Sequence, residues 1–267
     1  METVLFIIHL QEECELSPNT VKSYKMALEQ FFERFREMNK YNLMQYKQQL
    51  IAEGKKPATV NLRITAMNRY CDYIRHPEYK VKKLKVVRTS FVENVITPEE
   101  YSYLLECLLK DGNERGYWMI RFLAQTGVRV SEFVRLPKSC LEAGCCELPS
   151  KGRIRRIIIP DVLIEESRDY FSKQNSDRLF ISINGKELSK DAVRSNLQRW
   201  AEKYGVRKTV MHPHSFRHLF AIQFLKKNSN IALLADLMGH ADVGTTSIYL
   251  RLSRQEQAKL LNDTMVW

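Results

Sequence analysis

Apolar side chains recur every three or four residues along most of this chain, so its fold must be built mainly from amphipathic helices. One series spans residues 21–35 and follows Ser17-Pro18, where the serine can cap a helix and the proline can occupy its first position. A second series spans residues 60–74. We therefore predict a small all-helical domain over residues 1–80.

A basic segment follows these helices. Between Arg75 and Arg88 the sequence holds six basic residues and one acidic residue, Glu78, and Pro77 disfavours a continuous helix. We interpret residues 81–95 as a linker. It is either a solvated connector or a strap along a phosphate backbone, where each neutralised phosphate adds to affinity and to salt sensitivity.

A second domain is expected over residues 96–267. Thr97 and Glu100 form the sequence pattern of a capping box, which marks a helix start. Helical patterns continue over residues 117–136 and resume at Lys190.

The pattern changes between those two helical regions. Residues 145–148 and 154–159 are short and rich in β-formers, and Lys151-Gly152 lies between them, so we predict a β-hairpin. Residues 178–183 are a candidate for a further strand before the turn at Asn184-Gly185. The expected fold class is mainly α (α+β), with an all-helical N-terminal bundle and a mostly helical C-terminal domain carrying a small antiparallel sheet.

The charge balance predicts a polyanionic partner. The 267 residues include 42 Lys and Arg against 31 Asp and Glu, a formal charge of +11, which suits nucleic acid or an anionic membrane surface. The longest apolar run, Val4 to Ile8, is far shorter than the ~20 residues of a membrane span. Glu2 beside it argues against a signal peptide. We therefore expect a cytoplasmic protein without a membrane partner, for which DNA is the better ligand.

Six cysteines show no spacing of a disulfide framework, which favours reduced thiols. Cys140, Cys145 and Cys146 lack a paired C-x-x-C and a second nearby pair, so we predict no metal site.

Two sequence patterns place arginine beside a helix start. His214 and Arg217 are three residues apart in a helical segment, so both can reach one phosphate, although this spacing more often marks surface neighbours. Arg129 follows the turn residue Gly127, and Glu132 lies where its carboxylate can orient a neighbour.

Three further residues have proton-transfer or nucleophilic side chains. Lys151 lies at the expected hairpin tip, from which a compact ammonium can enter a DNA groove and donate a proton. Gly239 is expected to end a helix, and His240 follows it directly. Tyr249 lies nine residues after His240. Each has an ordinary structural explanation, namely a soluble hairpin tip, a charge at a helix end and a buried aromatic ring.

The order of these residues is more specific than any one of them. It resembles the tyrosine recombinase family, also called phage integrases, and in particular its compact Xer-like members. The segment 17–24 is similar to the opening of that family's SAM-like core-DNA-binding domain, so the resemblance covers nearly the whole chain. It implies catalytic roles for Arg129, Lys151, His214, Arg217, His240 and Tyr249.

The chain departs from the family pattern around Lys151. The hairpin reads Ser-Lys-Gly where Gly-Lys-Gly is frequent, and the run to Pro160 is one residue longer, so the loop geometry around this lysine departs from the family pattern. Phe216 also replaces a frequent leucine, which preserves an apolar contact.

The resemblance implies a reaction. Tyr249 would attack a phosphodiester to give a 3′-phosphotyrosine, with His214 accepting the phenol proton and Lys151 protonating the departing 5′-oxygen. Arg129 and Arg217 would clamp the phosphate oxygens. The covalent bond conserves the broken linkage, so no cofactor is expected.

The resemblance also implies partners. Four protomers would act on two double-stranded DNA duplexes, and the apolar residues within 253–267 could dock on a neighbouring subunit or on their own domain. The expected DNA contacts are Lys80, Lys82, Lys83, Lys85, Arg88, Arg153 and Arg155. Two alternatives stay open: a non-cleaving, recombinase-like DNA-binding regulator, and a type IB topoisomerase or telomere resolvase. The DNA site and the biological element served are not encoded in any pattern found.

Overall fold

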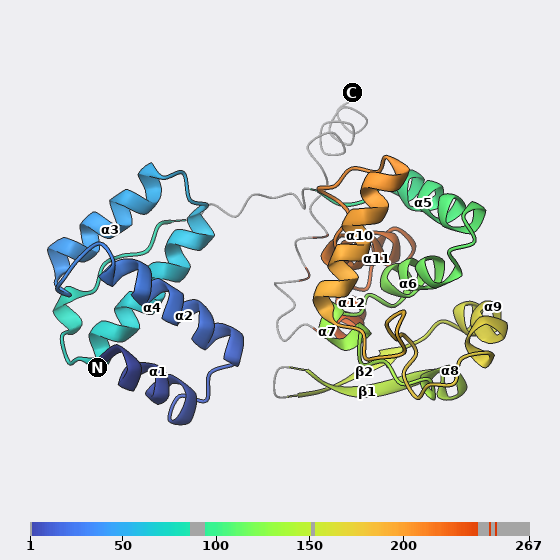
Figure 1. The fold of residues 1–267 in the computed structure, drawn as a ribbon, viewed down its shortest axis with the longest axis horizontal. Helices are drawn as coiled ribbons and strands as arrows, with labels where there is room; N and C mark the ends of the chain where they lie inside the picture. Colours follow the sequence, from blue (N-terminus) through green and yellow to red (C-terminus); the bar gives the residue numbers. More distant parts are fainter. Residues whose placement is uncertain (1, 86–93, 151–152, 240–245, 247–248, 250–267) are drawn as a thin grey trace, which may run out of the picture. The chain divides into compact units, whose positions relative to one another are not determined.

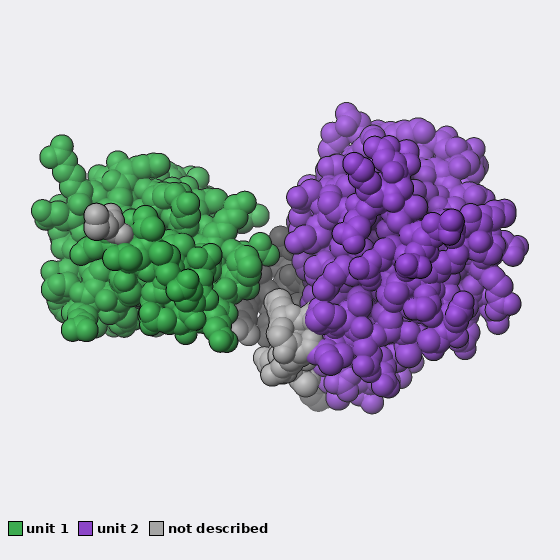
Figure 2. Space-filling model, turned by 60° about the horizontal axis from the view of Figure 1, so that its bottom comes forward, with its two compact units in different colours: residues 1–89 green, residues 90–267 purple. Residues whose placement is uncertain are grey.

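The structure is a computed structural model that describes residues 2–85, 94–150, 153–239, 246 and 249. The chain is mostly helical, with a two-stranded antiparallel sheet (Figure 1), as the sequence predicted. It divides into two compact units, Met1–Thr89 and Ser90–Trp267, coloured separately in Figure 2. None of the helices described is long and apolar enough to cross a membrane.

Unit 1 is a helical bundle. Ser17 caps its second helix by accepting a hydrogen bond from the backbone N–H of Thr20 at 3.3 Å, as its sequence predicts. Phe31 and Tyr46 meet edge to face in the core, with ring centroids 5.3 Å apart. Its elements are α1 (Glu2–Glu12), α2 (Pro18–Phe32), α3 (Lys40–Ala52), α4 (Pro57–Tyr73) and the short 3-10 helix η1 (Pro77–Tyr79).

The first helix is an addition to the sequence prediction. The apolar run from Val4 to Ile8 lies within α1, where Phe6 and Leu10 are fully buried. Residues 81–85, which fall at the start of the linker predicted over 81–95, follow α4 closely, and Val81 and Leu84 pack against the core of unit 1.

The first helix of unit 2 begins at the expected capping box. The backbone N–H of Thr97 donates to Glu100 at 2.9 Å, and the backbone N–H of Glu100 donates to the Thr97 hydroxyl at 3.2 Å. Its helices are α5 (Pro98–Lys110), α6 (Glu114–Thr126), α7 (Val130–Phe133), α8 (Cys140–Ala143), α9 (Asp161–Ser172), α10 (Lys190–Tyr204), α11 (Pro213–Lys227) and α12 (Ile231–Met238). Helices α6 and α11 pack against each other in its interior. This pairing brings the segments around residues 127 and 217 together.

The predicted hairpin is present. Strand β1 (Cys145–Ser150) pairs antiparallel with β2 (Arg153–Ile158), in a register that places Ser150 opposite Arg153. Lys151 and Gly152 lie outside the described residues.

The further strand expected over residues 178–183 does not form, and the prediction is wrong there. Within the described span 153–239, this segment makes only isolated bridges, from Arg178 to Pro137 and from Ile181 to Glu187. Its apolar pattern arises because Leu179 and Phe180 insert into the core of unit 2. The chain then turns back at once, with the N–H of Ser182 donating to Lys186 at 2.7 Å.

Candidate active site

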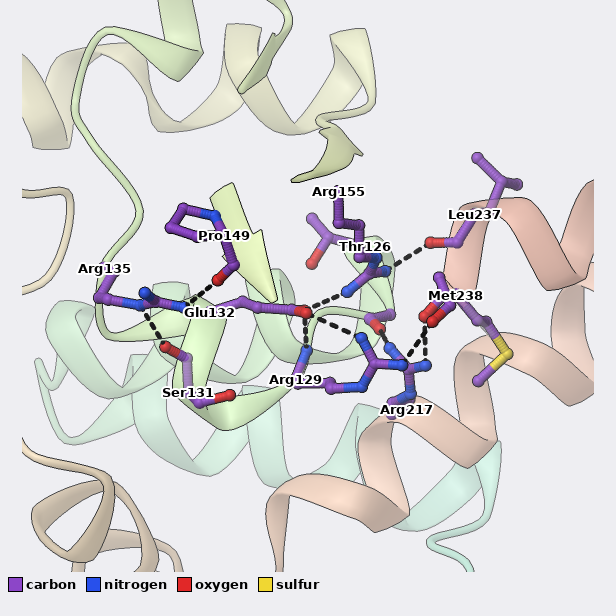
Figure 3. A network of polar contacts seen from close by, with 12 residues as sticks. Thr126, Arg129, Ser131, Glu132, Arg135, Pro149, Arg155, Arg217, Leu237 and Met238 are labelled. Carbon is purple, nitrogen blue, oxygen red and sulfur yellow. Dashed lines mark hydrogen bonds and ion pairs between the residues drawn. The ribbon is translucent and has the colours of Figure 1, made fainter. Parts of the chain in front are cut away.

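Arg129 is held at the start of α7. The turn before it needs Gly127, whose φ is 59° and whose absent Cβ would lie 2.5 Å from the ring of Phe220. The backbone N–H and Nη1 of Arg129 donate to Glu132 at 2.8 and 2.9 Å. Its Nη2 donates to the carbonyl of Gly239 at 2.6 Å. Nη1 of the guanidinium is therefore oriented by α7, and Nη2 is oriented by the end of α12 (Figure 3).

Glu132 is the buried acceptor at the centre of this network. Its side chain is 0 % exposed and accepts hydrogen bonds from Arg129 and from Nη1 of Arg155. A buried carboxylate is costly unless it is paired, so these contacts explain its position. The carboxylate of Glu132 thus joins Arg129 and Arg155.

Arg155 lies inside unit 2, which corrects the expectation that it contacts DNA from the hairpin surface. Along β2, Arg155 and Ile157 are buried, whereas Ile154 and Ile158 are exposed, because side chains alternate between the two faces of a strand. Besides its contact with Glu132, Arg155 donates through Nη2 to the carbonyl of Leu237 at 2.5 Å. Burial lowers its pKa, and the negative charge of Glu132 opposes that shift.

Arg217 is the third guanidinium of the cluster. It projects from α11, is 4 % exposed, and donates to the carbonyls of Gly127 and Met238. Burial lowers its pKa to about 9, and the positive charges of Arg155 and Arg129 act in the same direction.

The end of α12 holds all three arginines. Consecutive carbonyls of Leu237, Met238 and Gly239 accept from Arg155, Arg217 and Arg129 respectively. The last carbonyls of a helix lack partners within the helix and carry partial negative charge, so they suit cations. Gly239 closes this end with a φ of 60°, and a Cβ there would collide with the side chain of Arg155.

The cluster has a net positive charge. Among the described residues, three guanidiniums lie around a single carboxylate, that of Glu132, which pairs with Arg129 and Arg155. Such an excess in a poorly solvated position favours an anion such as a phosphate diester.

Tyr249 lies beside this cluster, against α11. Its hydroxyl is 2.6 Å from Nδ1 of His218, and the two ring centroids are 5.4 Å apart. The ring is half-buried and packs near Ala221, Leu234 and Met238. Burial raises the pKa of Tyr249 to about 12, while Arg217 opposes that rise. The phenol is therefore protonated at neutral pH and needs a proton acceptor to become a nucleophile.

Two histidines lie one helical turn apart near this phenol. The ring centroids of His214 and His218 are 6.4 Å apart on α11. His214 is more exposed, yet desolvation lowers its pKa, followed by the charge of Arg217. His214 lies three residues before Arg217, so these two side chains share one face of α11.

The structure thus gathers Arg129, Glu132, Arg217, His214 and Tyr249 around two packed helices and the end of a third. His240, Lys151 and Arg88 lie outside the described residues, and the side chain of Arg153 is not described. In the surface set, Lys82, Lys83 and Lys85 are exposed, whereas Lys80 forms an ion pair with Asp72.

Sequence reasoning missed His218. The signal was present, because this residue directly follows Arg217 and lies four residues after His214, a spacing that places two side chains on one helical face.

Metal ligation has no support among the residues described: no three His, Cys, Asp or Glu side chains there form a group that could hold an ion.

Comparisons with known proteins cover both units. The model of the phage integrase family matches residues 94–256, and the model of the phage integrase N-terminal SAM-like domain matches residues 4–77. A tyrosine recombinase XerD of Oceanobacillus iheyensis is 26% identical over 278 residues, covering 93% of each chain. A tyrosine recombinase XerA of Pyrococcus furiosus is 27% identical over 264 residues, covering 92% of this chain and 90% of its own.

Solved structures share the fold. The Tn1549 transposon integrase in complex with transposon right end DNA has a TM-score of 0.74 at 16% identity, covering 100% of this chain and 99% of its own. The XerH site-specific recombinase bound to its difH substrate has a TM-score of 0.68 at 21% identity, covering 92% of this chain and 79% of its own.

Proposed function

Because this chain belongs to the phage integrase family, we propose that it is a site-specific DNA recombinase that cleaves and rejoins DNA through Tyr249. The observation that carries the proposal is the convergence of Arg129 and Arg217 on one buried cluster beside the Tyr249 hydroxyl. The relatives named above are recombinases and integrases, so neither the non-cleaving regulator nor the topoisomerase gains support from them.

Charge neutralisation is the first requirement of the reaction. A phosphodiester repels nucleophiles because its oxygens are negative, and charge builds up as the fifth bond forms at phosphorus. Arg129 and Arg217 would bind the two non-bridging oxygens, with His214 and His240 adding hydrogen bonds. Their carbonyl and carboxylate partners hold the two guanidiniums before DNA arrives, so little reorganisation is needed.

The covalent step transfers one bond at phosphorus. The Tyr249 oxygen attacks, the bond from phosphorus to the 5′-oxygen breaks, and the products are a 3′-phosphotyrosine and a 5′-hydroxyl. The phenol proton passes to an imidazole. The family resemblance implies His214 for this role, but the 2.6 Å contact between the Tyr249 hydroxyl and Nδ1 of His218 favours His218. Lys151 would supply the proton of the 5′-hydroxyl.

Rejoining needs no external energy source. A 5′-hydroxyl from the partner strand attacks the phosphotyrosine, and Tyr249 leaves as the phenol. The linkage energy stays in the covalent bond, so this chemistry calls for no cofactor.

We also propose that four protomers assemble on the DNA. Two duplexes with four exchanged strands need four protomers, and residues 253–267 would link neighbours through Leu260, Leu261, Met265 and Trp267. Truncation after Ser253 should abolish synapsis and leave binding of a single duplex intact. Unchanged tetramer formation would refute the role of this segment.

The deciding experiment traps the covalent complex. Full-length protein is incubated with sheared, nicked DNA of the source genome and denatured, and the protein-linked DNA is sequenced while the linked peptide is identified by mass spectrometry. We expect DNA attached to Tyr249 at one recurrent sequence, and no adduct with Tyr249→Phe. An adduct at another residue, or none although DNA is bound, would refute the proposal.

A further inference from the structure

The segment after η1 is fastened to α4 by two asparagines. Asn68 donates through Nδ2 to the carbonyl of Val81 at 2.9 Å and accepts at Oδ1 from its N–H at 3.0 Å. Asn61 repeats this arrangement with Leu84, at 3.0 Å to the carbonyl and 2.7 Å from the N–H. Each side chain thus satisfies both backbone groups of one residue, as a neighbouring strand would.

The spacing of the two pairs fixes the conformation of the chain between them. Asn61 and Asn68 are seven residues apart on α4, which is ~10.5 Å along a helix axis. Val81 and Leu84 are three residues apart, which is ~10 Å only if the backbone is extended. The two pairs can therefore close together only on an extended segment that runs opposite in direction to α4.

Three further contacts support residues 80–85, which we call the clamped segment. Lys80 forms an ion pair with Asp72 near the end of α4. Lys47 of α3 donates to the carbonyl of Lys82 at 2.7 Å. The side chains of Val81 and Leu84 are half-buried against the core of unit 1. The backbone is thus fixed from 80 to 84 without any side chain of 82, 83 or 85 being used.

The side chains left exposed all carry positive charge. Lys82, Lys83 and Lys85 are exposed. The acidic groups nearest in sequence are engaged elsewhere, since Asp72 pairs with Lys80 and Glu78 lies 2.8 Å from His76. An extended backbone presenting three ammonium groups matches a line of phosphates, and a backbone already ordered loses less conformational entropy on binding.

We propose that Asn61 and Asn68 are positioning residues that preform a binding surface for the sugar-phosphate backbone of DNA on the clamped segment. The inference rests on the proposed function for its ligand and extends it to two neutral residues outside the catalytic unit. The lysines bind the phosphates, and the asparagines act through them.

The test is a double-mutant cycle on the full-length protein, with a fluorescent duplex of arbitrary sequence as probe. One arm is Lys82→Ala/Lys83→Ala/Lys85→Ala, and the other is Asn61→Ala/Asn68→Ala. The matched control is Asn42→Ala, which removes an amide that donates to the carbonyl of Glu37 at 2.9 Å. Affinity is measured over a series of salt concentrations.

Two results are expected. The lysine variant should flatten the dependence of log affinity on log salt by about 2.7, if each lysine neutralises one phosphate. The asparagine variant should weaken binding about tenfold through the lost preordering, and the lysine substitutions should then cost less than in the native background. The Asn42→Ala variant should match the native protein. An unchanged salt slope, or additive effects of the two arms, would overturn the proposal.

Amide hydrogen exchange tests whether the asparagine variant loses only the clamped segment or unfolds more widely. The amides of Val81 and Leu84 should be protected in the native protein and exchange quickly in the asparagine variant, while amides of α4 stay protected. Fast exchange of both amides in the native protein would also overturn the proposal. Covalent trapping separates the two proposals: adducts with additive arms refute only the clamp, whereas coupled arms without any adduct refute only the recombinase.

Discussion

The hydroxyl of Tyr249 lies 2.6 Å from Nδ1 of His218, a residue one helical turn beyond His214. Burial raises the pKa of this phenol to about 12, so it is protonated at neutral pH, and it donates to Nδ1 when the imidazole carries its proton on Nε2. The contact gives Tyr249 both a fixed orientation and a place for its proton.

Replacing His218 tests those two roles separately. His218→Ala should slow adduct formation by about 10²- to 10⁴-fold, the usual contribution of a proton-transfer residue. His218→Asn should remain slow, because an amide can hold the hydroxyl but cannot take its proton. Single-turnover cleavage rates against pH provide the measurement, with His214→Ala alongside. A near-native rate for His218→Asn would reduce His218 to a positioning residue.

The two arginines of the cluster should dominate catalysis. Arg129→Ala or Arg217→Ala should each lower the cleavage rate by about 10²- to 10³-fold or more, because each removes donors aimed at the developing charge. The matched control is Arg135→Ala, which removes a nearby guanidinium bound to the carbonyls of Ser131 and Pro149 at 2.9 and 2.7 Å (Figure 3). A comparable rate loss in the control would contradict the assignment.

Arg155 should behave as a structural cation rather than a DNA contact. Arg155→Ala leaves the buried carboxylate of Glu132 with one donor fewer, so unfolding free energy should fall by about 3 kcal/mol. Its neighbour Arg156 is exposed and pairs with Glu147 at 3.1 Å, so Arg156→Ala should change stability by less than about 0.5 kcal/mol. Denaturant unfolding of both variants provides the comparison. Equal stability would show that Arg155 does not support the cluster.

The glycine at the end of α12 should be intolerant of any side chain. Gly239→Ala places a Cβ against Arg155 and also strains a φ of 60°, so both stability and cleavage should fall. Gly205→Ala is a matched control: its φ is 68°, but nothing lies within 4 Å of the added atom, so only the backbone strain of about 1 kcal/mol applies. Equal losses in the two variants would argue against the contact with Arg155.

Alkaline pH should ionise the phenol of Tyr249 and lower the stability of the folded protein. Its folded pKa of about 12 lies above the ~10 of a solvated phenol, so its burial contributes stability that is complete below pH ~10 and is lost as pH rises through about 12. The difference in tyrosinate absorbance between the native protein and Tyr249→Phe isolates this group. Ionisation of the difference signal near pH 10 would show that the phenol is solvated.

Local signals in the sequence predicted local structure well. Ser17 and Thr97 mark helix starts because their caps use groups within three residues. Helix α9 escaped prediction because its first residue, Asp161, follows Pro160 without a side-chain cap. The order and spacing of residues along the chain predict the candidate site residues. They do not predict which of these side chains contact each other in the folded protein.

The features that the sequence did not predict depend on packing between segments far apart in the chain. Its charge places Arg155 among the expected DNA contacts, whereas its alternation with Ile157 and Ile159 indicates the buried face. The partner of Tyr249 depends on where a residue 31 positions further along folds back onto α11. The clamped segment joins residues 13 and 23 positions apart through neutral amides, which no periodicity indicates.

The three successive carbonyls that end α12 make the arrangement of the arginines a collective property. A shift of this helix by a single residue would change one acceptor of every guanidinium at once. One short helix thus supplies one acceptor to each of the three cations, while Glu132 and the carbonyl of Gly127 supply the others from a different part of unit 2.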